Sequence, residues 1–309
     1  MKSIKALILG ISLSISISTL AQEQSQQKLP LLSIVTEMPD TAMDSLSEAF
    51  SKKAIPSWAA IISTTALTYH YDEDLIEGSQ NTGRRWGLAQ HDHTKTVLKM
   101  GQYDILRLPS DTASWLYFMG DGWLDMMVAG GFMATGYFGD HVRPYNTAIQ
   151  LIHGMVVSGI AVQVLKRSTG RESPSDASCE RGCWRPFTEP RKYDAHTSKY
   201  DAMPSGHVMT TTLVWTIIRT NYSEYDHILF PAEIAWISTL GFAMMNNKVH
   251  WASDYPLAIG MGYVIGKAAT RMGQPYNKKA EDGKTASNWF FMPGASLDGT
   301  STLNAIKYF

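Results

Sequence analysis

Apolar residues along this chain gather in segments of helical length that are separated by polar stretches. Six segments share this pattern: residues 58–69, 115–137, 148–166, 208–220, 233–246 and 255–271. They are rich in Ala, Met, Leu and Gly and show little strict alternation of apolar and polar positions, which favours helix over strand. Six such segments predict an all-α protein, a helical bundle of about six core helices.

The first residues have the layout of a secretory signal peptide. Lys2 and Lys5 precede an apolar run at 6–17, and Ala21 lies just before the polar sequence that begins at Gln22. A basic start, a short apolar run and a final small residue are typical of a signal peptide, here cleaved after Ala21. A membrane anchor is the alternative, but the run is short for a helix that spans a bilayer. The sequence therefore predicts secretion across an inner membrane and a periplasmic location.

The polar connection at 167–203 is 37 residues long, far more than an ordinary loop between helices, and we expect it to border a functional site. Near the end of the chain, apolar stretches at 289–292 and 303–309 flank a segment with Pro and Gly, which predicts a short C-terminal hairpin or tail. The chain thus divides into a signal peptide (1–21), an N-terminal extension with the first helix (22–95), a helical domain (96–275) and a C-terminal tail (276–309).

Two stretches without charged residues, 144–165 and 54–71, are long enough to span a membrane. Polar residues such as Asn146, Gln150 and His153 dilute the first of them, and the mean hydropathy of the chain is only -0.14. This composition favours the buried helices of a soluble or peripheral bundle, with an integral membrane protein as the alternative.

The charge balance excludes a general affinity for nucleic acid. The chain has 27 Lys+Arg against 28 Asp+Glu, a formal net charge of -1, so any anion must bind a local cluster of cations. Only two cysteines, Cys179 and Cys183, are present, which excludes a disulfide-rich scaffold. In an oxidising compartment we expect them to form a disulfide rather than free thiols. No second cysteine pair accompanies them, and His91 and His93 lie in a polar stretch, so no metal site is predicted.

The sequence Pro204-Ser205-Gly206-His207 directly precedes the apolar segment 208–220. Pro and Ser are favoured at a helix start, and Gly lets an anion approach the exposed backbone N–H groups at the positive end of the helix. This pattern is typical of an anion-binding helix start with a histidine beside it. Alone, it is equally compatible with an ordinary helix cap.

A second histidine follows 43 residues later, in His250-Trp251-Ala252-Ser253-Asp254. At this spacing Asp254 can accept a hydrogen bond from one ring nitrogen of His250 and leave the other nitrogen basic, as a histidine nucleophile requires. A third element, Lys166 to Pro174, opens the polar connection with cations that suit phosphate oxygens. A serine hydrolase triad is not supported, because the chain lacks a Gly-x-Ser-x-Gly sequence around Ser205.

In this order the three elements resemble the type-2 phosphatidic acid phosphatase and vanadium haloperoxidase superfamily. Its pattern is Lys, six residues, Arg-Pro; then Pro-Ser-Gly-His; then Ser-Arg, five residues, His, three residues, Asp. The match covers residues 150–271. The resemblance implies an acid phosphatase-like helical bundle in which a histidine attacks phosphorus and forms a phosphohistidine.

The resemblance also implies a role for each matching residue. His250 would be the nucleophile, Asp254 its orienting partner, and His207 the general acid that protonates the leaving oxygen. Lys166, Ser205 and the Gly206 backbone N–H would hold the phosphoryl oxygens. Stabilisation of charge on those oxygens would be the largest catalytic effect.

Two arginines of the pattern are replaced in this chain. Ser173 stands at the first position and Met244 at the second. Arg171 and Lys248 are the nearby cations that we expect to substitute for them as phosphate-binding residues. A missing charge-assisted hydrogen bond weakens the binding of a buried anion by about 1.5–3 kcal/mol, so these substitutes decide between an active and a feeble enzyme.

The sequence therefore predicts an extracytoplasmic phosphatase of phosphate monoesters or lipid phosphates, without a metal or other cofactor. A membrane surface is a second expected partner, and nucleic acid is not. Vanadate would act as an inhibitor or, in a haloperoxidase, as the cofactor. The other alternative is a relative with weak or no activity that binds anions or lipids.

Overall fold

The computed structural model describes residues 27–91, 93–101, 103–272, 289–295 and 301–307. The predicted signal peptide lies outside these residues. The chain forms two compact units, Met1–Thr270 and Arg271–Phe309, and each is described by itself.

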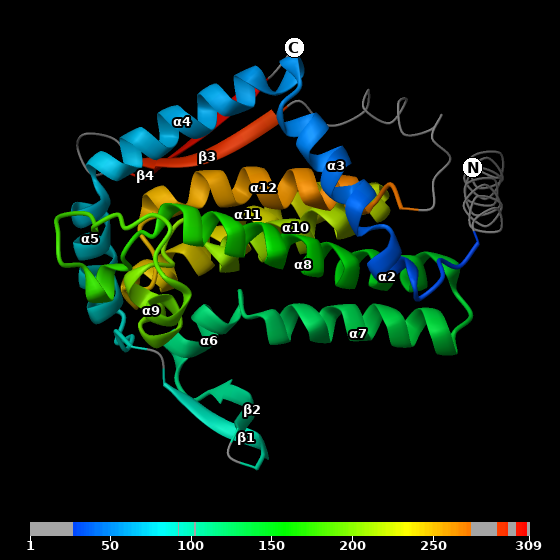
Figure 1. Ribbon diagram of the computed structural model, residues 1–309, viewed down its shortest axis with the longest axis horizontal. Coiled ribbons are helices and arrows are strands. Elements are labelled where there is room, and N and C mark those ends of the chain that lie inside the picture. Colours follow the sequence, from blue (N-terminus) through cyan, green and yellow to red (C-terminus); the bar gives the residue numbers. More distant parts are fainter. Residues whose placement is uncertain (1–26, 92, 102, 273–288, 296–300, 308–309) are drawn as a thin grey trace, which may run out of the picture. The chain divides into compact units, whose positions relative to one another are not determined.

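The first unit is a helical bundle, which confirms the all-α prediction. Helix α10 (Gly206–Asn221) packs against three others: α8 (Val142–Thr169), α11 (Asp226–Asn246) and α12 (Tyr255–Ala269). Figure 1 shows these helices running side by side, with α7 (Gly122–Phe138) along α8.

Two hydrophobic clusters fill the bundle. One joins α7, α8, α10 and α12 around Leu151, Leu213 and Ile217, all fully buried. The other joins α8, α10, α11 and α12 around Met209 and Met244 and lies toward the start of α10. Because buried apolar surface is the main stabilising contribution to a fold, these clusters fix the positions of the helices that carry the motif residues.

Small residues let α12 approach its neighbours closely. A Cβ atom on Gly262 would lie 2.3 Å from the Met209 carbonyl oxygen of α10, and one on Gly266 would lie 2.9 Å from Thr216 Cβ. A Cβ on Gly260 would lie 2.7 Å from Ile61. The glycines therefore allow the close packing of α12 on α10, and this packing holds the start of α12 beside the start of α10.

The segment expected to form one helix at 115–137 forms two. Helix α6 (Thr112–Phe118) ends before Gly120, and Asp121 caps the start of α7 by accepting a hydrogen bond from Trp123 N at 2.8 Å. A Cβ on Gly120 would lie 2.5 Å from Leu240 and 3.2 Å from His207 Cβ. The chain therefore turns beside His207, and α6 brings Tyr117 into contact with that histidine.

The N-terminal part contains the short helix α2 (Ser33–Thr36), α3 (Met38–Ala49), α4 (Ile55–His70) and α5 (Asp72–Arg85). The apolar pattern predicted α4 but missed α5, because α5 is polar over most of its length. Three acidic residues in its first turn and two arginines in its last turn suit the helix dipole. A hairpin of β1 (Thr94–Met100) and β2 (Tyr103–Pro109) was also not predicted.

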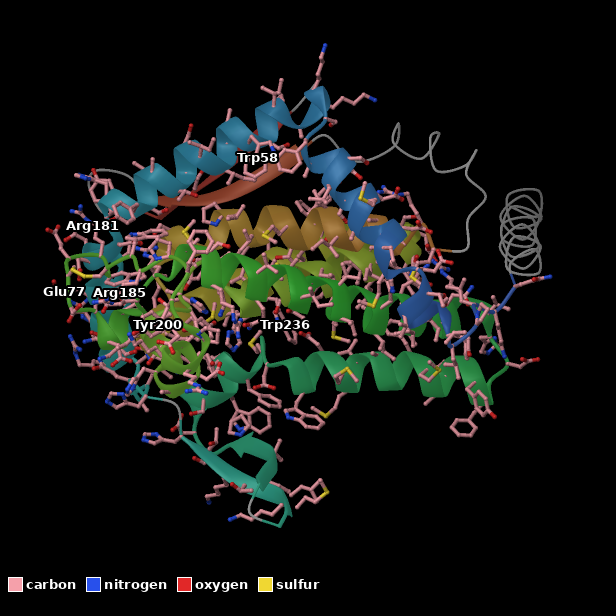
Figure 2. The ribbon with its side chains drawn as sticks, in the orientation of Figure 1. Trp58, Glu77, Arg181, Arg185, Tyr200 and Trp236 are labelled. Carbon is pink, nitrogen blue, oxygen red and sulfur yellow. A yellow bond between two sulfur atoms is a disulfide. The ribbon has the colours of Figure 1, made fainter. Side chains whose placement is uncertain are left out.

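The polar connection between α8 and α10 is an ordered segment with a short helix, α9 (Pro190–Ala195). Its backbone is tied to the N-terminal part, because Arg181 N donates to Glu73 Oε1 of α5 at 2.9 Å. Figure 2 shows Arg181 and Arg185 of this connection at the end of the bundle where α5 lies.

The second unit contains an antiparallel hairpin of β3 (Trp289–Ala295) and β4 (Ser301–Lys307), in which Trp289 pairs with Lys307 and Ala295 with Ser301. The predicted C-terminal hairpin is therefore confirmed.

Two helical stretches in the described part of the chain are long and apolar enough to cross a membrane: Val142–Thr169 and Ser223–Asn246. Length and composition alone support this, and the buried core helix of a soluble protein passes the same test. About half of the most apolar window of the first stretch is buried inside the bundle.

Candidate functional site

The start of α10 and the loop before α12 meet at one end of the bundle. Ser205 caps α10, because its Oγ accepts a hydrogen bond from Val208 N at 3.4 Å. The Ser205 backbone N–H donates to the Asp254 carbonyl oxygen at 3.1 Å. This bond joins the two motif segments directly.

His250 and His207 are brought together by this arrangement. Their ring centroids are 5.9 Å apart in an edge-on orientation, and His250 is 2% exposed. The Nδ1 atom of His250 lies 3.6 Å from Asp254 Oδ2, which is longer than a hydrogen bond. Such contacts are often long in a free site and tighten when a substrate is bound. The two side chains are close, but His250 Nδ1 has no hydrogen-bond partner among the described residues, so the role of Asp254 as orienting partner stays a prediction.

Lys166 reaches the same place from the end of α8. A Cβ on Gly206 would lie 3.8 Å from Lys166 Nζ, so the ammonium group stands over the Gly206 backbone at the helix start. The Nζ atom also lies 3.3 Å from Asp201 Oδ2, and the Lys166 residue is 7% exposed. A buried ammonium beside the N-terminal end of a helix is a suitable place for an anion.

Burial controls the proton affinities of these side chains. Burial, His250 and Lys166 together lower the pKa of His207 to about 3. Burial and the Lys166 charge lower the pKa of His250 to about 3, against the opposing effects of Asp201 and of a hydrogen bond to the Ala202 backbone. Both imidazoles are therefore neutral at neutral pH. Neutral His250 is a competent nucleophile, whereas His207 needs the negative charge of a bound anion to take up a proton.

Asp254 has the opposite behaviour. Burial raises the pKa of its carboxyl group to about 6, although the Arg171 charge opposes this shift. The carboxylate is ionised above that pH. Its Oδ2 also accepts a hydrogen bond from Trp251 N at 2.8 Å, which fixes the direction of the group.

Comparison with known proteins identifies the region that carries these residues. Residues 147–278 match the family model of the PAP2 superfamily. This part of the chain belongs to the PAP2 superfamily. The resemblance seen in the three motifs is thereby confirmed, and the family supports a phosphatase function for this PAP2 domain.

Among solved structures, the chain is similar to a transmembrane PAP2-type phosphatidylglycerolphosphate phosphatase from Bacillus subtilis. The identity is 11%, the match covers 82% of this chain and 98% of the other, and the TM-score is 0.40. A similarity of that size supports no inference about substrate. A comparison with curated proteins gave no match.

Arg171 does not lie where its predicted role as a phosphate-binding substitute requires. It is fully buried and donates to Asp254, Ser253, Asp72 and the Arg181 carbonyl oxygen. These five hydrogen bonds use all five N–H donors of a guanidinium group. Arg171 thus binds Asp254 rather than facing an anion on His250, and we correct its assignment accordingly.

The positions that lack the motif arginines are both buried. Met244 has its sulfur 3.9 Å from Ser205 Oγ, so an apolar side chain stands beside the helix start of the PAP2 domain. Ser173 is held by its backbone, which donates to the Ser198 carbonyl oxygen at 2.8 Å. Lys248 is close to this segment, because its carbonyl oxygen accepts from Ser175 N at 3.0 Å. Within the described part of the chain the Lys248 side chain has no hydrogen bond or ion pair, and its role in phosphate binding stays a prediction.

Three residues at the site were not found from the sequence. Tyr117 of α6 places its hydroxyl oxygen 2.9 Å from His207 Nε2. Asp72 of α5 contacts Arg171, and Asp201 pairs with Lys166. Tyr117 and Asp72 lie outside the segment that matches the family, and no motif marks them. Asp201 was visible only as an acidic residue three positions before Pro204.

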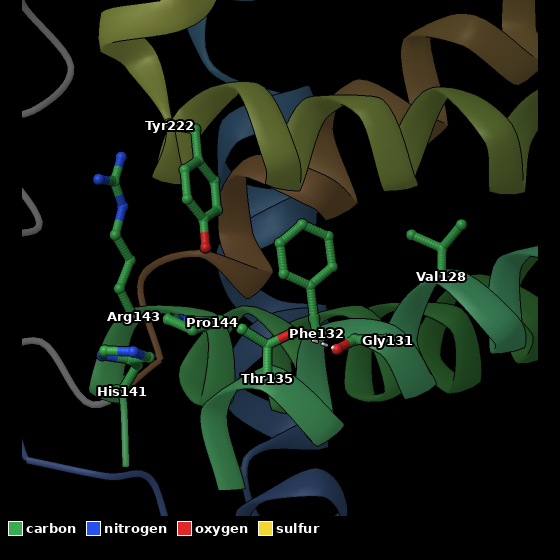
Figure 3. A pocket seen from close by; sticks show the side chains of 8 residues that line it. All are labelled: Val128, Gly131, Phe132, Thr135, His141, Arg143, Pro144 and Tyr222. Carbon is green, nitrogen blue, oxygen red and sulfur yellow. Dashed lines mark hydrogen bonds between the residues drawn. The ribbon is translucent and has the colours of Figure 1, made fainter. Parts of the chain in front are cut away.

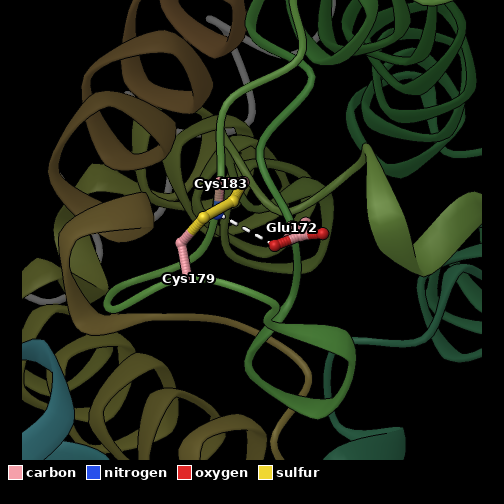
Figure 4. A group of neighbouring side chains, drawn as sticks. All are labelled: Glu172, Cys179 and Cys183. Carbon is pink, nitrogen blue, oxygen red and sulfur yellow. Dashed lines mark hydrogen bonds between the residues drawn. A yellow bond between two sulfur atoms is a disulfide. The ribbon is translucent and has the colours of Figure 1, made fainter.

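Glu172, which follows Arg171 in the sequence, anchors the polar connection through several hydrogen bonds. Figure 4 shows Glu172 beside Cys179 and Cys183. Cys179 and Cys183 are joined by a disulfide, and the Glu172 carboxylate accepts from Cys183 N at 2.9 Å and Ser178 N at 2.8 Å. Burial favours a higher pKa for Glu172, but these hydrogen bonds and the Arg185 guanidinium lower it to about 2. With both sulfurs in the disulfide, this cluster of Glu172 and two cysteines is not a metal site.

A separate pocket of about 510 Å³ lies between α7, the start of α8 and the end of α10 (Figure 3). Phe132 and Thr135 line it on α7, Arg143 on α8, and Tyr222 beyond α10. From His207 to Tyr222 the helix rises about 22 Å, so this pocket is remote from the two histidines. No predicted site residue lines it.

Proposed function

We propose that this protein is a phosphatase that hydrolyses phosphate monoesters or lipid phosphates through a phosphohistidine on His250. One observation carries the proposal: within a PAP2 domain, His250 and His207 stand 5.9 Å apart on two segments joined by a backbone hydrogen bond. A nucleophile and a proton donor on the two sides of one phosphoryl group need this kind of spacing.

The reaction has two steps in this proposal. In the first, the His250 nitrogen that does not face Asp254 attacks phosphorus, and the bond from phosphorus to the leaving oxygen breaks. His207 gives its proton to that oxygen, so the product leaves as an alcohol. In the second step water attacks the phosphohistidine and gives its proton to His207, which releases inorganic phosphate and restores both histidines.

The other residues of the site bind and orient. Asp254, whose Oδ2 lies 3.6 Å from His250 Nδ1, would orient the imidazole and stabilise the positive charge that develops on its ring. Lys166 and the first N–H groups of α10, from Gly206 onward, would hold the phosphoryl oxygens. Lys248 would add a second cation. No step in this scheme requires a metal or another cofactor, and vanadate, a mimic of the phosphoryl transition state, would inhibit.

The proposed location is extracytoplasmic, in a periplasm, at or near a membrane surface. The Cys179–Cys183 disulfide supports an oxidising compartment, and the two long apolar helices are compatible with contact to a membrane. Protease digestion of intact cells before and after the outer membrane is opened would test this location.

Hydrolysis of an aryl phosphate by the purified protein tests the function. We expect turnover that resists a chelator, is inhibited by vanadate and disappears in His250→Ala. His227→Ala is the matched control, because this histidine is exposed on α11 and should leave turnover unchanged. Turnover that persists in His250→Ala would exclude a phosphohistidine at this residue.

A second candidate, an anion-binding relative without activity, is favoured by one observation. Lys166 is already paired with Asp201, and Arg171 has no donor left for an anion. Calorimetry with inorganic phosphate and vanadate separates the two candidates. Binding without turnover of aryl or lipid phosphates would support an inactive anion-binding protein, whereas His250-dependent release of phosphate would exclude it.

A further inference from the structure

A buried network of charges lies directly next to Asp254. The two carboxylate oxygens of Asp254 have different partners: Oδ2 faces His250, and Oδ1 accepts a hydrogen bond from Arg171 Nη1 at 2.6 Å. Arg171 and Asp254 are both fully buried. The group that orients the proposed nucleophile is thus itself held by a cation.

Arg171 is fixed from several sides. Its Nη2 donates to Asp72 Oδ2 at 2.7 Å and to the Arg181 carbonyl oxygen at 2.9 Å, and its Nη1 also donates to Ser253 Oγ at 2.7 Å. The guanidinium group further lies 5.1 Å from the centre of the Tyr69 ring and 5.3 Å from that of Trp251. With five hydrogen bonds and aromatic rings around it, the guanidinium has one orientation only.

Asp72 comes from α5, far from the PAP2 domain in sequence. It is fully buried, and its two oxygens accept from Ser253 N at 3.0 Å, Ser253 Oγ at 2.5 Å and Arg171. Ser253 directly precedes Asp254. Asp72 therefore holds the segment that carries Asp254 in two ways, through Arg171 and through Ser253.

Two carboxylates share one cation here, and this arrangement is costly. Buried ions lose their hydration, and replacing such groups by apolar side chains is often neutral or stabilising. Burial raises the pKa of Asp72, against the effects of Ser253 and Arg171, just as it raises that of Asp254. Stability alone gives no reason for the network, whereas a need for an ionised and fixed Asp254 does.

We propose that Arg171 and Asp72 are positioning residues for the reaction at His250, with Arg171 holding Asp254 as a fixed carboxylate and Asp72 holding Arg171. The inference rests on the proposed function. It also makes α5, which lies before the segment that matches the family, a part of the working active site.

The charges around Asp254 determine the expected pH dependence. The titratable groups that face it are His250 in its own loop, Lys166 of α8, Arg171 of the polar connection, Asp72 of α5 and Tyr255 of α12. The Arg171 and Lys166 charges favour the ionised form of Asp254, and the Asp72 charge opposes it. Removing Arg171 or Asp72 should therefore have opposite effects.

The test compares pH profiles of kcat/KM for Arg171→Gln and Asp72→Asn with the wild type. We expect the acid limb, near pH 6 in the wild type, to move up by about one pH unit in Arg171→Gln and down by about half a unit in Asp72→Asn. Arg171→Lys keeps the charge and loses the fork of donors, so it should leave the limb near its wild-type place and lower kcat. A purely structural role would change the amount of folded protein and leave the limb in place.

The matched control is Arg219→Gln. Arg219 also binds two carboxylates, Asp226 and Glu233, but at the other end of α10. This variant should leave the acid limb where it is. An unchanged limb in both Asp72→Asn and Arg171→Gln, or a shift of the same sign in the two, would overturn the inference. If Arg171→Gln does not fold, Asp72→Asn and Arg171→Lys decide.

NMR titration of the His250 imidazole separates failure of this inference from failure of the proposed function. Ionisation of Asp254 should be visible at the His250 ring as an inflection near pH 6 that moves in the two directions given above. If the wild type shows no turnover, the phosphatase proposal fails, and this titration still decides whether Arg171 and Asp72 control Asp254. An inflection that neither variant moves would reject the inference even in an active enzyme.

Discussion

Two arginines of this molecule each bind two carboxylates, and the two clusters differ in depth and in reach. Arg171 is fully buried and joins Asp72 and Asp254, which are 99 and 83 positions away in the sequence. Arg219 has a side chain that is 21% exposed, and its partners Asp226 and Glu233 are only 7 and 14 positions away.

The difference shows what each cluster does. The Arg219 cluster closes the turn between α10 and α11, which follow each other in the chain. The Arg171 cluster instead joins three distant segments at Asp254, next to His250. A local cluster stabilises a connection, whereas a long-range buried cluster determines the geometry of a site.

Truncation of Arg171 should destabilise the protein far more than truncation of Arg219. Arg171→Ala leaves Asp72 and Asp254 as two buried carboxylates without a cation, and we expect a loss of about 3–5 kcal/mol of unfolding free energy. Arg219→Ala should cost less, about 1–2 kcal/mol, because Arg219 and Asp226 are partly exposed and only Glu233 is buried. Urea denaturation of both variants at pH 7 measures the difference. Equal losses would show that burial of the Arg171 cluster has no energetic consequence.

One buried carboxylate, Asp125, has no ion pair with a cation among the described residues. Asp125 of α7 is 4% exposed, its Oδ2 has no hydrogen-bond partner among the described residues, and burial together with Asp121 raises its pKa to about 7. Because the folded-state pKa is raised, the associated stability is complete below pH 4 and is lost as pH rises through about 7.

Asp125→Asn should remove the loss of stability that the wild type shows as pH rises. Relative to the wild type, we expect little change in unfolding free energy at pH 4 and a gain of up to about 4 kcal/mol at pH 8, from about three pKa units. Denaturation curves across this pH range check it. Asp121→Asn, at the partly buried cap of α7, is the control and should change the slope much less. A gain that is the same at both pH values would contradict the assignment.

A cation can be restored at Ser173, where the motif carries an arginine. Arg171 serves Asp254, so the phosphate side has lost the cation that the motif carries at Ser173. Ser173→Arg should strengthen vanadate binding about 10- to 100-fold through a charge-assisted contact. Ser175→Arg adds the same charge at an exposed position two residues away and should have little effect. Calorimetric titration with vanadate gives both affinities, and equal gains would indicate a general charge effect.

Removing the Tyr117 hydroxyl group from His207 should have only a small effect on kcat. The hydrogen bond between His207 and Tyr117 is a single contact between neutral groups, in contrast to the multiple charged contacts of Asp254. Tyr117→Phe should lower kcat about 2- to 10-fold and leave KM nearly unchanged. Tyr137→Phe, which is 66% exposed on α7, serves as the control. Steady-state kinetics with an aryl phosphate distinguishes these outcomes, and a change confined to KM would assign Tyr117 to binding.

The sequence was informative where a signal is local. The apolar segments predicted α4, α8, α10, α11 and α12 because each buries a face of its own residues. The spacing of His250 and Asp254 predicted that the two side chains lie close together, because both are in one short turn and helix start. The motif order predicted that His207 and His250 share a site, which the geometry supports.

The sequence was uninformative where the partner is distant. Helix α5 was not predicted because it buries few residues, and one of them is the acidic Asp72. An aspartate in a polar stretch normally faces solvent, and only the tertiary structure reveals the Arg171 guanidinium in front of it. The same reason explains the incorrect assignment of Arg171, since charge and spacing alone do not tell which anion a cation faces.

The backbone hydrogen bond from Ser205 to the Asp254 carbonyl oxygen has a mechanical consequence. The start of α10, which carries His207, and the loop that carries His250 are therefore attached to each other by a backbone hydrogen bond. A shift of the start of α10 away from the segment before α12 would have to break this hydrogen bond. A single peptide contact thus couples the backbone positions of the two histidines, although they stand on different segments of the chain.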